Sequence, residues 1–153
     1  MTMIPLFSRL KCATLIALSG GAMAQTMTLW GGDLARFLPP TAVMGLAGAG
    51  GAWLAGFALA GAFGREGWRG VMCSAVMWPV TTAVGAGLGA SLLALVPTGA
   101  PSRPLWTALE EGPGLGLLAV ADGIATSPVV ACVWLLSCAA IHHGARHERR
   151  AIT

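Results

Sequence analysis

Apolar residues in this chain fall into long runs separated by short polar stretches. The runs cover about residues 41–63, 71–96 and 115–141. Each run provides the roughly twenty consecutive apolar residues that a helix needs to cross a bilayer. A spanning segment must be helical, because the hydrocarbon layer offers no water to its backbone polar groups. The pattern therefore predicts an all-α, polytopic transmembrane protein in which residues 25–153 form a single helical domain.

The N-terminal segment, residues 1–24, has a different pattern. Arg9 and Lys11 precede a short apolar run, and small residues follow it up to Ala24. This order is typical of a secretory signal peptide that is cleaved after Ala24. The alternative is a signal anchor that stays in the membrane as an additional span. The sequence thus predicts three spans after a signal peptide, or four if the segment is retained.

Composition excludes an ordinary soluble domain. Of the 153 residues, 56% are hydrophobic and 10% are charged, and the mean hydropathy is +0.74. A soluble domain carries about a quarter charged residues. The net charge of +3 comes from basic residues at the ends of apolar runs rather than from a continuous patch. We therefore expect the lipid bilayer as a partner and no nucleic acid.

The distribution of cations predicts the orientation of the spans. If the signal peptide is cleaved, the mature N-terminus lies outside and the basic tail, residues 142–153, lies inside. The inner side then holds most of the cations, namely Arg65, Arg69, Arg146, Arg149 and Arg150, while the outer side holds Arg36 and Arg103. This excess follows the positive-inside rule, and a retained N-terminal segment would increase it. With an Arg-rich composition that favours a bacterial source, we expect a bacterial inner (plasma) membrane protein with a periplasmic N-terminus and a cytoplasmic tail.

Two of the predicted spans carry small residues at every fourth position, and so along one face of each helix. These residues are Gly48, Ala52, Gly56 and Ala60 in the first span and Gly85 and Gly89 in the second. Helices in lipid associate by close packing, and small side chains let two backbones approach. The pattern predicts helix-packing faces. Their partners are other transmembrane helices, in this chain or in a homo- or hetero-oligomer.

Asp122 is the acidic residue of the third predicted span. Thr126 follows one turn later on the same face, and Thr81 and Thr82 lie in the second span. A carboxylate inside the hydrocarbon layer is costly unless it is protonated, paired or facing water, so these four residues are candidates for a proton or small-cation relay. The alternative is that the true span starts near Gly123 and that Asp122 caps it at the headgroup level.

Evidence for a metal site or for catalysis is weak. Cys138 and His142 are four residues apart on one helix face, and their side chains could bind a soft metal. A histidine-rich tail at a membrane border is more often an anchor, and the four cysteines have no CxxC spacing. No nucleophile stands beside a base in the pattern. The sequence predicts no enzyme, no metal and no cofactor.

Three hypotheses for function follow from these patterns. The first is a non-enzymatic accessory or assembly subunit that packs against other membrane helices. The second is an oligomeric proton, cation or small-solute transporter or channel that uses Asp122. The third is a holin-like pore former, which would share the same layout of spans and basic tail. We favour the first, because almost all of the signal concerns packing and topology.

Overall fold

The structure, a computed structural model, describes residues 6–31, 41–94 and 104–150, and these residues are almost entirely helical. No strand occurs in these three ranges, which confirms the all-α prediction. The elements are α1 (Leu6–Trp30), α2 (Thr41–Leu59), the short 3-10 helix η2 (Ala60–Ala62), α3 (Gly67–Ala94), α4 (Leu105–Thr126) and α5 (Pro128–Arg150). Arg36, Arg103 and the last two residues of the predicted second span lie outside the described residues.

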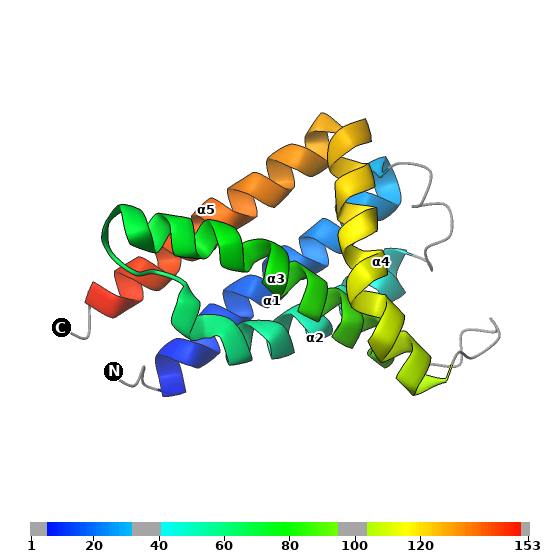
Figure 1. Cartoon of the computed structure of the whole chain (residues 1–153), viewed down its shortest axis with the longest axis horizontal. Coiled ribbons are helices and arrows are strands. Elements are labelled where there is room, and N and C mark those ends of the chain that lie inside the picture. Colours follow the sequence, from blue (N-terminus) through cyan, green and yellow to red (C-terminus); the bar gives the residue numbers. More distant parts are fainter. Residues whose placement is uncertain (1–5, 32–40, 95–103, 151–153) are drawn as a thin grey trace.

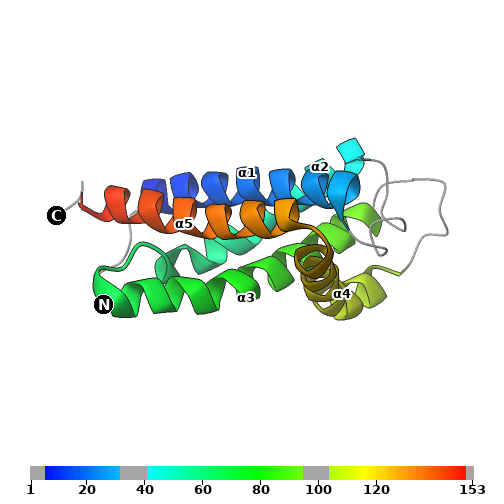
Figure 2. The ribbon, with the colours of Figure 1, turned by 90° about the horizontal axis from the view of Figure 1, so that it is seen from above.

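Four helices are long and apolar enough to cross a membrane. They cover Ser8–Trp30, Ala42–Ala62, Gly67–Leu93 and Pro128–Arg150. The prediction of a polytopic helical membrane protein is confirmed. In Figures 1 and 2 the spans run alongside one another, and the start of α1 and the end of α5, the termini of the described chain, lie at the same end of the bundle. The described part of the N-terminal segment, residues 6–24, belongs to this bundle. It lies in α1, which continues through Ala24 without a break and packs on α2.

The predicted third span, about 115–141, is not one helix. α4 ends at Thr126 and α5 begins at Pro128, and Figure 1 shows α4 crossing the bundle at the end remote from the termini. Ser127, between them, has extended backbone angles of φ −134° and ψ 114°. The proline ring disfavours helical angles in the residue before it, which accounts for the break. The last candidate span is therefore α5, which runs on through most of the predicted basic tail.

A tight turn joins α2 to α3 at the end of the bundle that carries the termini. Gly64 and Gly67 have φ values of +72° and +74°, in the left-handed region that favours glycine. Gly64 is buried against the backbone of α5 at Ala145 and Arg146, so this position also lacks room for a side chain. α3 therefore begins at Gly67, four residues before the start of the predicted second span.

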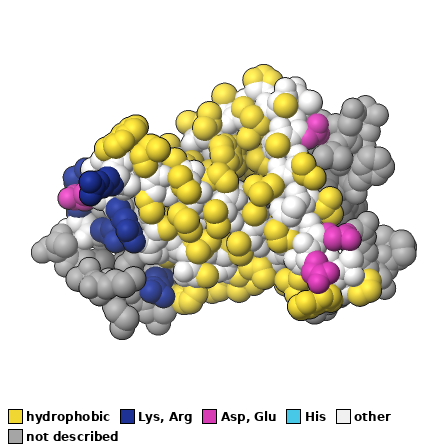
Figure 3. All heavy atoms as spheres, viewed as in Figure 1, with side chains coloured by type: hydrophobic (Ala, Val, Ile, Leu, Met, Phe, Trp, Pro, Cys, Tyr) yellow, Lys and Arg dark blue, Asp and Glu magenta, His cyan; other side chains and the backbone are white. Residues whose placement is uncertain are grey.

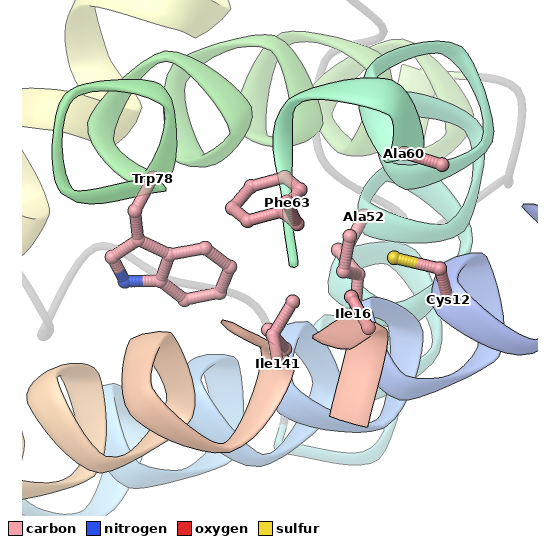
Figure 4. Packing of buried hydrophobic residues seen from close by; sticks show 8 residues of the cluster. Cys12, Ile16, Ala52, Ala60, Phe63, Trp78 and Ile141 are labelled. Carbon is pink, nitrogen blue, oxygen red and sulfur yellow. The ribbon is translucent and has the colours of Figure 1, made fainter. Parts of the chain in front are cut away.

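Two clusters of buried apolar side chains hold the bundle together. Figure 4 shows the larger one, in which α1, α2, α3 and α5 meet around Phe63 and Trp78, whose rings pack edge to face with centroids 6.5 Å apart. The second cluster joins Met23 and Met27 of α1 to Val120 of α4 and Val130 of α5. It lies towards the other end of α1 and secures the α4–α5 corner.

Candidate functional site

The small residues predicted as packing faces lie between helices of this chain. Gly48 faces α1, where an added Cβ would lie 2.8 Å from Ala24 Cβ and 3.1 Å from Gly20 O. Gly56 faces the same helix, with Ile16 Cβ at 2.9 Å from the equivalent position. Both glycines therefore allow α1 and α2 to approach at the level of their backbones.

The other side of α2 meets α3 in the same way. An added Cβ at Gly85 would lie 3.3 Å from Ala52 Cα, and one at Gly89 would lie 3.0 Å from Ala47 O. Gly51 is the most confined residue of this seam, because its Cβ would overlap Gly85 O and lie 2.5 Å from Gly89 N. Sequence reasoning missed Gly51, which lies outside the four-residue ladder. Ala60, the last residue of that ladder, is buried in the larger apolar cluster.

A cavity of about 290 Å³ lies beside this seam, with walls from all five α-helices. Thr81 and Thr82 line it, and their hydroxyls donate to the main-chain oxygens of Met77 (2.8 Å) and Trp78 (3.0 Å). Most of the remaining wall is Ala, Gly, Met and Leu. The cavity is therefore an apolar space between helices, and sequence periodicity carries no direct signal for it.

Asp122 and Thr126 are not part of this wall. Both belong to α4, where Asp122 is half-buried and Thr126 is exposed. The Thr126 hydroxyl donates to the main-chain oxygen of Asp122 at 2.7 Å. The structure thus brings Thr81 and Thr82 to the cavity and leaves the other two residues of the predicted relay outside it.

The end of the bundle that holds the termini is rich in cations. Figure 3 shows Lys and Arg side chains gathered there beside an acidic side chain, and further acidic side chains at the opposite end, with an apolar surface between the two ends. Lys11 of α1 pairs with Glu148 of α5 at 2.9 Å, and Arg150 pairs with Glu66 at 3.0 Å. These contacts connect α5 to α1 and to the α2–α3 turn.

Arg149 has a structural task at the same end. Its Nε donates to Phe63 O at 3.0 Å, and its Nη2 donates to Gly61 O at 2.9 Å. The last carbonyls of a helix have no partner within the helix, and a cation there also complements the helix dipole. Arg149 therefore caps the end of α2 and η2 from a distant part of the sequence.

A polar contact between α3 and α5 lies further into the bundle than the ion pairs of the basic end. Ser74 is 1% exposed, and its Oγ lies 2.7 Å from His142 Nδ1, within hydrogen-bond distance. The weak metal candidates were His142 and Cys138, and this contact occupies one ring nitrogen of His142. In residues 6–31, 41–94 and 104–150, no group of three or more His, Cys, Asp or Glu residues is placed to hold a metal ion. The Ser74–His142 pair was invisible to sequence reasoning, because 68 positions separate its members.

The arrangement as a whole provides close helix seams, an apolar cavity and a basic end, all on a membrane-spanning scaffold. Comparison of the chain with protein-family models, with curated proteins and with solved structures finds no match.

Proposed function

We propose that the protein is a non-enzymatic accessory or assembly subunit of the bacterial inner membrane, and that it acts by packing α5 against a helix of another membrane protein. One observation carries this proposal. Only 17% of the apolar window of α5 is buried within the chain, against 28% to 39% in the other three candidate spans. α5 is the span with the most surface left for a partner.

The composition of the uncovered surface of α5 supports a helical partner. Its exposed residues combine small side chains with leucine and valine: Val129, Cys132, Leu135, Leu136, Ala139 and Ala140. Small residues let a second backbone approach closely, and the larger ones provide dispersion contacts. The small faces of α2 and α3 already meet other helices of this chain, so α5 is the better candidate for docking.

The basic end of the bundle is proposed to face the cytoplasm. The positive-inside rule assigns the cation-rich loops and ends to that side. We further propose that α1 is retained, which would place both ends of the chain in the cytoplasm. The support is the burial of Ala24, at the predicted cleavage position, against Gly48 in the middle of an intact helix pair.

Purification from membranes in a mild detergent tests the docking proposal. The variant Ala139→Leu/Ala140→Leu enlarges two exposed alanines of α5, and Ala75→Leu enlarges an exposed alanine of α3 as the matched control. We expect wild type and the α3 variant to bring down the same membrane protein, and the α5 variant to lose it. A partner that survives the α5 change, or a wild-type protein that purifies alone, contradicts the proposal.

The N-terminus is tested separately. We expect intact mass measurement of the purified protein to show a chain that retains the residues before Gln25. A mature chain that begins at Gln25 would contradict retention of α1.

A further inference from the structure

The apolar cavity lies in the half of the bundle remote from the basic end. Along α1 its wall runs from Ile16 to Met27, and along α3 it runs from Trp78 to Leu93. These are the halves of both helices that lead away from the termini in Figure 1, towards the end crossed by α4. α4 completes the wall with a stripe of residues from Gly112 to Val120. Helices that are long enough to cross the membrane therefore form one side of the cavity, and α4, which runs across them, forms another.

The wall has the chemistry of a site for a hydrocarbon chain. It contains no charged residue. Its two threonine hydroxyls, of Thr81 and Thr82, use their hydrogens on helix carbonyls and so offer none to a ligand. Met23, Met27 and Met44 also line the space, and flexible thioether side chains adapt to irregular apolar shapes.

Water is a poor occupant of such a space. A buried water needs two to four polar partners, whereas apolar cavities stay dry and take up apolar molecules. The volume of about 290 Å³ is close to the lower end of the range for small-molecule sites, roughly 300 Å³. If left empty, the lining atoms would forgo their dispersion contacts, which are the main source of packing energy between helices in lipid.

We propose that this cavity binds one acyl chain of a membrane phospholipid. The cavity is partly open to its surroundings, and the helices that surround it cross the hydrocarbon layer. Acyl chains are the apolar molecules present at high concentration around these helices. Because the wall carries no charged residue, the site takes the apolar chain, while the charged headgroup stays outside. This lipid site is independent of the proposed docking of α5.

Photo-crosslinking in reconstituted vesicles tests the proposal. The full chain is reconstituted in vesicles of phosphatidylethanolamine and phosphatidylglycerol that contain a trace of phosphatidylethanolamine with a diazirine in one acyl chain. After illumination, digestion and mass spectrometry locate the labelled peptides. We expect labelling of wall residues, above all on the methionine-bearing half of α1 and on the cavity-facing stripe of α4.

Variants distinguish a bound chain from the lipids that coat any membrane protein. Ala119→Phe and Leu93→Trp each place a larger side chain in the wall, whereas Ala121→Phe makes the same change at an exposed position of α4. We expect both wall variants to lose the wall labelling and the control to keep it. Circular dichroism and gel filtration check that each variant folds, and Leu93→Trp carries the test if Ala119→Phe does not fold.

Three results would overturn the proposal. The first is labelling spread evenly over the outer faces of all helices in wild type. The second is wall labelling that is unchanged in both wall variants. The third is an isoprenoid quinone or another apolar molecule that co-purifies with the protein and is not displaced by phospholipid.

Discussion

The close packing of α2 on α3 leaves no room for a side chain at Gly51. In Gly51→Ala the new methyl group would overlap Gly85 O and lie 2.5 Å from Gly89 N, where ordinary contact starts at 3.4 Å. Both obstructing atoms belong to the backbone of α3, so no rotation of a side chain relieves the overlap. The helices must separate by on the order of 1 Å, as small-to-large changes in packed cores require.

The neighbouring residue gives a matched control. An alanine at Gly50 would meet only the tip of the Leu92 side chain, at 2.9 Å, and that tip can move. Both substitutions replace a helical glycine and gain about 1 kcal/mol in helix propensity, so this gain cancels in a comparison of the two. What remains is the cost of overpacking the seam, about 1–3 kcal/mol. A gap of this size also forfeits about a quarter to a half of each dispersion contact along the seam.

Reversible unfolding in mixed micelles measures the difference. Sodium dodecyl sulfate is titrated into protein in a mild non-ionic detergent, and the fluorescence of the six tryptophans reports the transition. We expect Gly51→Ala to be less stable than Gly50→Ala by about 2 kcal/mol, with Gly50→Ala close to wild type or slightly more stable. Equal free energies of unfolding for the two variants would refute the reasoning, because they would show that α2 and α3 do not meet at Gly51.

Three further predictions use the same unfolding measurement. Arg149→Met should lower the free energy of unfolding by about 2 kcal/mol, because it removes charge-assisted hydrogen bonds to two carbonyls at a helix end. Arg150→Met should change it by less than about 1 kcal/mol, because its ion pair is exposed. Similar losses in the two variants would contradict the capping role of Arg149. Gly64→Ala and Gly67→Ala both place a side chain on a left-handed backbone, which costs roughly 1–2 kcal/mol of stability. Gly64→Ala should lose more stability than Gly67→Ala, because its Cβ also overlaps the backbone of α5. An equal loss of stability in the two variants would argue against that contact. Ser74→Ala should destabilise the protein by about 1 kcal/mol through the lost bond to the imidazole of α5, and a neutral effect would show that this bond contributes nothing.

Some of the fold followed directly from the sequence. The spans that became α2 and α3 were predictable from composition alone, because a run of apolar residues of that length has no stable alternative to a helix across a bilayer. The helix-packing faces were recognisable because a four-residue spacing puts side chains on one face wherever the helix goes. The gathering of Arg residues at one end of the bundle was predictable, because successive loops alternate between the two ends and the loops and tail of one end carry most of the Arg residues. These features depend on neighbours in sequence, and so a single sequence shows them.

The sequence pattern predicts one helix over about residues 115–141, whereas the structure has two helices there, α4 and α5, for a local reason. The apolar run continues through Ser127, so hydropathy counts one segment, but the proline that follows disfavours helical angles at Ser127 and turns the chain. α4 consequently crosses the bundle, and Asp122 belongs to this crossing helix. A local backbone restriction outweighed the continuity of the hydropathy pattern.

Only the tertiary structure decided which faces meet. Gly48 and Gly56 pack on α1, and Gly85 and Gly89 pack on α2. In this arrangement α1 is a full member of the bundle. The same packing created the apolar cavity and the contact between Ser74 and the imidazole of α5, neither of which has a periodic signal. The physical reason is that small-residue faces all look alike along the chain, and in lipid the choice among them is made by the fit of one helix surface to another.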